Sequence, residues 1–200
     1  MKSFNILHVI LFVIILLPNK IMCQVEDKDS VAHDVVQYDY HTKQDISYTV
    51  KDAQDCLAKA RNGDTNAMHR IAWLYCGGLG MRTDYDSAFY WIQKAAQTGD
   101  PASMCSLGWF YEHGKGTDQD FAKAFYWYKK SAEKNYAAAE CDVGFYYEYG
   151  YQVVPKDLKQ AEYWFERAVK HGDTTAKKHL EKVKAFIATD RYTNSPETDY

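Results

Sequence analysis

The sequence predicts an all-α fold, a solenoid of three stacked helical hairpins. One pattern is written three times between Asp64 and Asp173, and its tryptophans are spaced by 36 and then 37 residues. Self-similarity at a period between about 20 and 50 residues is typical of stacked repeats. The recurring aromatic positions are Tyr75, Tyr111 and Tyr147 in the first half of each copy, and Trp91, Trp127 and Trp164 in the second half.

Each copy contains two helical patterns joined by a glycine-bearing loop. In the second copy the first helix is predicted over 101–113, with Asp100 as its N-cap, and the second over about 120–134. In the third copy Asp157 and Gln160 have the spacing of a capping box. These signals predict a helical hairpin in each copy.

Small residues recur inside the first helix of each copy, at Ala72, Gly108 and Gly144. A methyl group or a hydrogen in place of a larger side chain lets two helices approach closely, and nearby Trp and Tyr rings can fill the space beside the crossing. Leucine at position 108 is therefore expected to overpack the hairpin.

Length and composition describe one domain of ordinary soluble character. The chain has 200 residues, of which 46% are hydrophobic and 26% charged. Aromatic residues are abundant at 16%, which calls for a structural use. The net charge of −3 gives no reason to expect nucleic acid or an anionic membrane as partner.

Residues 1–23 resemble a secretory signal peptide. Lys2 precedes an apolar run over 6–17 that is shorter than the about 20 residues of a membrane span. Cleavage is predicted after Cys23. Two alternatives remain, a lipoprotein acylated at Cys23 and an uncleaved signal anchor, the latter being the one expected membrane contact. The predicted location is secreted or periplasmic.

The remaining segments flank a repeat domain predicted over 51–188. Residues 24–50 are polar and lack a helical or strand period, so they are expected to be a linker of low order with at most a short strand at 46–50. Residues 189–200 are expected to be a flexible tail.

The repeats resemble the Sel1-like repeat, a relative of the tetratricopeptide repeat. In the second copy the motif is Leu107-Gly-x-x-Tyr111-x-x-Gly114-x-Gly116, followed by Asp120-x-x-Lys-Ala124-x-x-Trp-Tyr128. Three copies are covered, about 66–100, 101–136 and 137–173, and the first copy departs by having Ile92 where an aromatic residue is usual. Segments 52–63 and 175–188 resemble half-repeats and suit end caps with a polar outer face. The resemblance implies a right-handed helical-hairpin solenoid with half-repeat caps at both ends.

The cysteines that follow residue 23 lack an obvious disulfide framework. Cys105 and Cys141 occupy one position in successive repeats, which stack about 8–10 Å apart, beyond the reach of a disulfide. They are expected to be buried thiols. A bridge between Cys56 and Cys76 stays open.

No catalytic, metal or cofactor site is predicted. The glycine loop at 77–80 has helical patterns on both sides, so it is better explained as a helix end than as a phosphate loop. Glu112, His113 and Glu148 lack metal-ligand spacing and are expected to be exposed surface. No Ser-x-x-Lys motif accompanied by its partner elements is present.

One row of aromatic residues is the candidate binding surface. Trp73, Trp109 and Phe145 share a position almost opposite the buried stripe of the first helices. The resemblance implies that first helices line the concave surface, and the flanking positions change from basic to acidic along the row. The alternative is that these rings are ordinary core. The flanking candidates are His69, Arg70, Ser106 and Asp142.

The preferred function is therefore an exported interaction scaffold that binds a peptide or protein on its concave face. One alternative is an envelope-associated hydrolase, or a protein that interacts with β-lactams or peptidoglycan. The other is a carbohydrate-binding module, because aromatic faces also stack on sugars.

Overall fold

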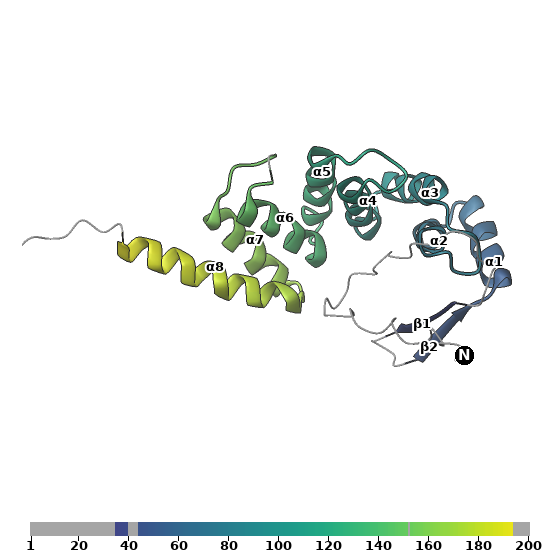
Figure 1. The fold of residues 1–200 in the computed structure, drawn as a ribbon, viewed down its shortest axis with the longest axis horizontal. Coiled ribbons are helices and arrows are strands. Elements are labelled where there is room, and N and C mark those ends of the chain that lie inside the picture. The colour runs from purple at the N-terminus through teal and green to yellow at the C-terminus, as the bar shows by residue number, and fades with distance from the viewer. Residues whose placement is uncertain (1–34, 40–43, 152, 194–200) are drawn as a thin grey trace, which may run out of the picture.

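A computed structural model describes residues 35–39, 44–151 and 153–193, and the predictions for the signal peptide and for 194–200 lie outside these ranges. In the described part, α2 and α3, α4 and α5, and α6 and α7 form three helical hairpins that follow an arc (Figure 1). The helices are α1 (Val50–Arg61), α2 (Thr65–Gly77), α3 (Tyr85–Gln97), α4 (Pro101–His113), α5 (Phe121–Ala132), α6 (Ala137–Tyr149), α7 (Leu158–Lys170) and α8 (Thr174–Thr193).

The caps of the solenoid are helices, as predicted. α1 packs on the first hairpin through Ala53, Cys56 and Ala60, which are all buried. α8 packs on the last hairpin through Ala176 and Val183. An all-α solenoid of three hairpins with a half-repeat at each end is therefore confirmed for the repeat region.

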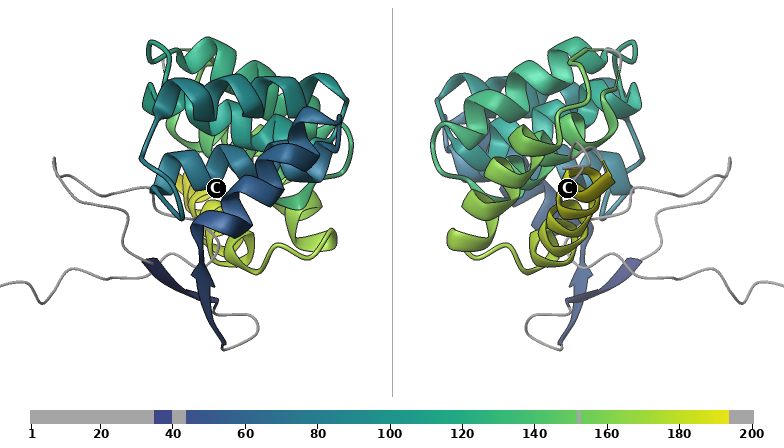
Figure 2. Two further views of the ribbon diagram at one scale, coloured as in Figure 1. Left: turned by 90° about the vertical axis from the view of Figure 1, so that its right-hand side faces the viewer. Right: turned by 90° about the vertical axis from the view of Figure 1, so that its left-hand side faces the viewer.

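Two strands precede the solenoid, where the sequence suggested at most one short strand at 46–50. β1 (Val35–Asp39) and β2 (Gln44–Tyr48) pair antiparallel, with Val35 opposite Tyr48 and Asp39 opposite Gln44. Both segments contain β-branched and aromatic residues, which favour strands, and a short connection lets them pair locally. The pair lies outside the helical stack (Figure 2).

Aspartates begin most of the helices. Asp100 accepts a hydrogen bond from the Ser103 N–H at 2.7 Å, and Asp157 accepts from the backbone N–H groups of Lys159 and Gln160. Asp157 is thus an N-cap as predicted. The two-sided capping box among the described helices lies instead at Thr49 and Asp52 of α1.

The recurring tyrosine closes each hairpin through its backbone. The carbonyl oxygens of Tyr75, Tyr111 and Tyr147 accept hydrogen bonds of 2.9–3.0 Å from the backbone N–H groups of Asp84, Asp120 and Asp157. Each of these aspartates is also the N-cap of the following helix. One bond therefore joins the end of the first helix to the start of the second.

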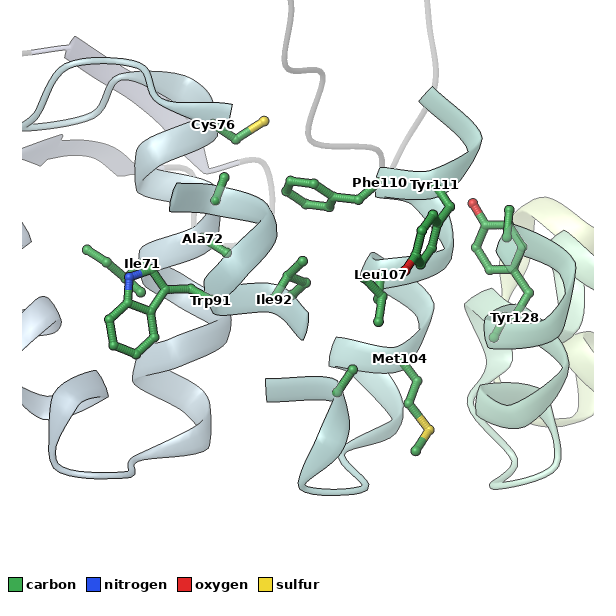
Figure 3. Packing of buried hydrophobic residues seen from close by; sticks show 14 of the residues in the cluster. Ile71, Ala72, Cys76, Trp91, Ile92, Met104, Leu107, Phe110, Tyr111 and Tyr128 are labelled. Atoms are coloured by element: carbon green, nitrogen blue, oxygen red, sulfur yellow. The ribbon is translucent and has the colours of Figure 1, made fainter. Parts of the chain in front are cut away.

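Glycines let an aromatic ring lie against the first helix. A Cβ on Gly108 would stand 2.8 Å from the Tyr128 ring, and a Cβ on Gly144 would stand 2.6 Å from Phe165. The first hairpin has the larger Ala72 together with the smaller Ile92 at the equivalent positions. Both are fully buried and lie near each other in Figure 3. The unusual Ile92 is thus compensated by a methyl group on the facing helix.

A buried carboxylate ties the third hairpin together. Glu140 is fully buried, at the repeat position that holds Met68 and Met104. Its carboxylate lies 2.8 Å from Arg167 Nη2 and 2.7 Å from His171 Nδ1. Because a buried charge is costly without a partner, this network links α6 firmly to α7.

Candidate partner-binding surface

The rings of Trp73 of α2 and Trp109 of α4 are in contact with each other. Their ring centroids are 5.2 Å apart and their planes are tilted by 51°. Both rings also contact the fully buried Phe110, at 5.6 and 5.5 Å. Each indole is half-buried, so the pair is anchored in the core and still reaches solvent.

His69 orients the first indole. The Trp73 Nε1–H donates to His69 Nε2 at 3.3 Å, and Ser106 Oγ lies 2.9 Å from the same nitrogen. An indole N–H can only donate, so Nε2 must be the unprotonated nitrogen, and the Ser106 hydroxyl then donates to it as well. Burial lowers the pKa of His69 below its ordinary value and thereby favours this neutral form.

His113 covers the second indole. Its ring stacks on Trp109 with a centroid distance of 4.3 Å and an interplanar angle of 23°, and its Nδ1 lies 3.0 Å from the Trp109 carbonyl oxygen. Sequence reasoning missed His113 as part of this surface, although its spacing of four residues from Trp109 was a usable signal. His69, Trp73, Trp109 and His113 together form what we call the aromatic strip.

Phe145 does not join the aromatic strip. Its ring packs 5.3 Å from Phe165 of α7 and 4.6 Å from His179 of α8. The cap helix α8 covers α6, and its side chains take up this face of Phe145. The predicted row of three is thus a touching pair of tryptophans and a separate phenylalanine.

The flanking candidates keep the expected change of charge. Arg70 is exposed next to His69 on α2. At the other end, Asp142 of α6 is half-buried, and its Oδ2 lies 3.5 Å from Cys105 Sγ. Ser106 stands between them and is bound to His69. The surface therefore runs from a basic to an acidic end.

The recurring tryptophans of the second helices lie mainly inside the solenoid. Trp91 is 8% exposed and Trp164 is 3% exposed, while Trp127 is half-buried. Their part is to pack the hairpins together.

Several expectations about reactive groups can now be settled. Cys56 is a free buried thiol that donates to the Ala67 carbonyl oxygen, so the possible bridge to Cys76 is not formed. Ser131 and Lys134 have Ser-x-x-Lys spacing, yet the Ser131 hydroxyl is fully buried and donates to the Pro101 carbonyl oxygen at 2.6 Å. That hydroxyl cannot serve as a nucleophile in this arrangement.

The expectation that Glu148 is surface is wrong. Glu148 is 5% exposed, and its carboxylate lies 2.7 Å from Lys182 Nζ and 3.5 Å from His179 Nδ1 of the cap helix. The Glu112 carboxylate also has a partner within the repeat, because it accepts a hydrogen bond from the Tyr128 hydroxyl at 2.8 Å. Glu148 is buried because Lys182 and His179 of α8 lie beside its carboxylate. The sequence alone could not show that α8 packs next to Glu148.

Two further searches cover the described residues alone. No group of three or more His, Cys, Asp or Glu side chains is placed to hold a metal ion within 35–39, 44–151 and 153–193. Within the same ranges, no helix has both the length and the apolar character needed to cross a bilayer.

Together the fold and the surface define a class of protein, the helical-hairpin repeat proteins. The particular family follows from comparison with known proteins. The family model of the Sel1 repeat matches residues 65–100, 101–136 and 137–173, so the chain belongs to the Sel1 repeat family. A comparison with curated proteins finds no match.

Solved structures of similar fold come from several bacteria. A Sel1 repeat protein from Oxalobacter formigenes is 34% identical over 66% of this chain and 98% of its own, with a TM-score of 0.58. The protective antigen c5321 of uropathogenic Escherichia coli is 26% identical, with a TM-score of 0.63. That match covers 74% of this chain but 30% of the antigen. Helicobacter pylori cysteine rich protein B is 24% identical over 66% of this chain and 96% of its own, with a TM-score of 0.55, and shows the fold alone.

Proposed function

We propose that this chain is an exported interaction scaffold that binds a peptide or protein segment along its aromatic strip. Sel1 repeat proteins are generally protein–protein interaction scaffolds and are typically non-enzymatic. The observation that carries the proposal is the pair Trp73 and Trp109, which touch each other and remain partly exposed. Tryptophan is among the residues most enriched in binding hot spots.

The aromatic strip is suited to binding because its rings are already held in place. Trp73 is fixed by His69, and Trp109 is held between Trp73 and His113. Ordering side chains before a partner arrives reduces the entropy lost on binding. Arg70 and Asp142 supply opposite charges at the two ends, which favours one direction of a bound segment.

Export is the second part of the proposal. It is supported by residues 1–23, whose basic start and short apolar run are typical of a signal peptide. The partner is accordingly sought outside the cytoplasm, among secreted or envelope proteins.

The test is affinity capture with residues 24–200, comparing wild type with a Trp73→Ala and Trp109→Ala double variant. We expect the double variant to lose the partner while its helical circular dichroism stays unchanged. Phe186→Ala is the matched control, because this exposed aromatic residue lies on the cap helix. If the double variant loses its helical signal, the two rings are core residues and the proposal fails.

A carbohydrate-binding role is the second candidate, since partly exposed tryptophans also stack on sugar rings. His113 already stacks on Trp109 at 4.3 Å, which leaves less ring face for a sugar. A glycan array probed with the same variants separates the two functions. If a glycan binds and its binding is lost in the Trp73→Ala and Trp109→Ala variant, the partner is a carbohydrate and not a peptide.

A further inference from the structure

A second row of aromatic side chains lies on the second helices, outside the aromatic strip. Tyr90, Tyr126 and Tyr163 occupy one repeat position on α3, α5 and α7. They are 48%, 51% and 50% exposed, whereas most aromatic rings of the repeats are at least half-buried. We call these three residues the tyrosine row. Because the same exposure recurs in each hairpin, the row is a regular property of the surface.

Each ring of the tyrosine row is held by the tryptophan that follows it. Tyr90 packs edge-to-face with Trp91 at a centroid distance of 5.2 Å, and Tyr126 does so with Trp127 at 5.4 Å. Tyr163 packs in the same way with Trp164 at 5.2 Å. The tyrosines are thus fixed by the core although they face solvent.

A cation lies over every ring of the row, four residues further along the helix. Lys94 Nζ is 4.7 Å from the Tyr90 centroid, and Lys130 Nζ is 4.6 Å from that of Tyr126. The guanidinium of Arg167 is 5.8 Å from the Tyr163 centroid. Cation–π contacts at such exposed sites are weak, so these charges remain able to bind other groups.

The lysines of the row have no acidic partner in the described part of the chain. Arg167 is bound to Glu140, whereas neither Lys94 nor Lys130 forms an ion pair among the described residues. Lys129 adds a further positive charge, 4.3 Å from the Trp164 centroid. The positive charge of the row therefore lies at Lys94, Lys129 and Lys130, since Arg167 is paired and the exposed acids Asp86 and Glu166 lie on α3 and α7.

We propose that the tyrosine row is a second docking surface, which binds an acidic polypeptide segment in extended conformation. Carboxylates of that segment would pair with Lys94 and Lys130, and the tyrosine hydroxyls would bond to its carboxylates or backbone. A polypeptide fits better than an anionic polysaccharide because a lysine already covers one face of Tyr90 and of Tyr126. A sugar would need such a face for stacking, and a peptide needs only the hydroxyl and the ring edge.

The position of the row suits an extended segment. Lys129 of α5 reaches Trp164 of α7, and Arg167 Nη2 donates to the Ala132 carbonyl oxygen, so long side chains connect these two second helices. The row places one tyrosine on each successive hairpin, so an extended segment that runs along the stack would pass over all three rings. In Figure 1, α3 and α5 follow the outer side of the arc and α2 and α4 the inner side. Both surfaces can therefore be occupied at once.

The test uses a fluorescent peptide with Glu at every third position, together with its Gln analogue, in fluorescence anisotropy at low salt. We expect residues 24–200 to bind the Glu peptide and not the Gln analogue. A Lys94→Glu and Lys130→Glu double variant is expected to bind about tenfold more weakly. Lys177→Glu with Lys178→Glu is the matched control, because these exposed lysines lie on α8 and carry the same charge change. An equal loss in both variants would mean non-directed attraction and would overturn the proposal.

A second variant tests the tyrosines themselves. Tyr90→Ser with Tyr126→Ser keeps every lysine, so an unchanged affinity for the Glu peptide would overturn the part assigned to the rings. Sulfated dextran is the competing probe. If it binds in a manner that depends on Lys94 and Lys130 and the Glu peptide does not bind, the occupant is a polysaccharide and the proposal fails. Binding of the Glu peptide by the Trp73→Ala and Trp109→Ala variant should be unchanged, which separates the two surfaces.

Discussion

At the scale of single residues, His69 shows how burial selects a protonation state. The imidazole lies 37 residues before Ser106 and four residues before Trp73, and it accepts hydrogen bonds from both. A proton on Nε2 would remove the bond from Trp73, reverse the bond with Ser106 and place a charge among apolar rings. His69 is therefore part of the support of the aromatic strip, and its effect depends on pH.

Stability is expected to decrease in acid because of His69. Burial lowers the pKa of His69 from its ordinary 6.5, so the unfolded chain takes up a proton at higher pH than the folded one. The free energy of unfolding then falls as the pH drops below about 6.5, down to the folded pKa, and is unaffected by this group at higher pH. Urea unfolding of wild type and His69→Gln at about pH 7.5 and about pH 5.5 measures this. Equal losses of stability in both proteins would contradict the assignment.

At the scale of helix pairs, the size of one side chain is matched by the size of its neighbour. Gly108 faces Tyr128, Gly144 faces Phe165, and the first pair combines Ala72 with Ile92. The pairing follows from close packing, because a ring can lie on the helix backbone only where no Cβ projects. The recurrence of small residues in the sequence predicted this close approach, and the structure identifies which ring uses it.

Gly108→Leu is expected to reduce the free energy of unfolding by about 1–3 kcal/mol, or more if α5 cannot shift. Even a Cβ at this position would stand 2.8 Å from Tyr128 and 3.1 Å from the Ala124 carbonyl oxygen. Chemical denaturation measures the difference. Ala122→Leu is the control, since Ala122 is exposed on α5 and can accept a larger side chain. Equal stability of Gly108→Leu and wild type would show that the helices are not in close contact here.

At the scale of the whole molecule, stability is distributed along the stack. Each hairpin packs mainly on its neighbours, so the end helices matter most to the pair beside them. α8 is longer than the repeat helices and holds the last hairpin with Ala176, Val183 and the pair formed by Lys182 and Glu148. Removal of α8 should therefore destabilise the last hairpin more than the first.

Deleting residues 174–200 is expected to raise amide hydrogen exchange in α6 and α7 and to leave α2 and α3 protected. The deletion uncovers Phe165, which is fully buried, and leaves Glu148 without its two partners on α8. Hydrogen exchange followed by mass spectrometry resolves the individual helices. A shorter deletion of 190–200 keeps Val183 and is the control. Uniform loss of protection in all three hairpins would show that the solenoid unfolds as one unit.

What the sequence determined was the repeating part of the protein. Local signals such as the aspartate caps, the glycine breaks and the period of 36 to 37 residues sufficed for the hairpins and for their number. Each of these features depends on residues within one or two helical turns. Because they recur in every copy, the helix boundaries predicted in one copy support those predicted in the other two. Helical periodicity likewise predicted that Trp73 and Trp109 lie opposite the buried stripe, whereas their place on a concave surface was implied by the family resemblance.

Only the tertiary structure decided which side chains meet between helices. It separated Phe145 from the tryptophan pair, buried Glu148 beneath α8 and paired Glu140 with Arg167 and His171. It also showed that Tyr90, Tyr126 and Tyr163 are exposed beside tryptophans that pack into the stack. Such contacts depend on the angle at which two helices cross and on which end helix packs against the last hairpin. The periodicity of a single helix determines neither the crossing angle nor the neighbouring helix.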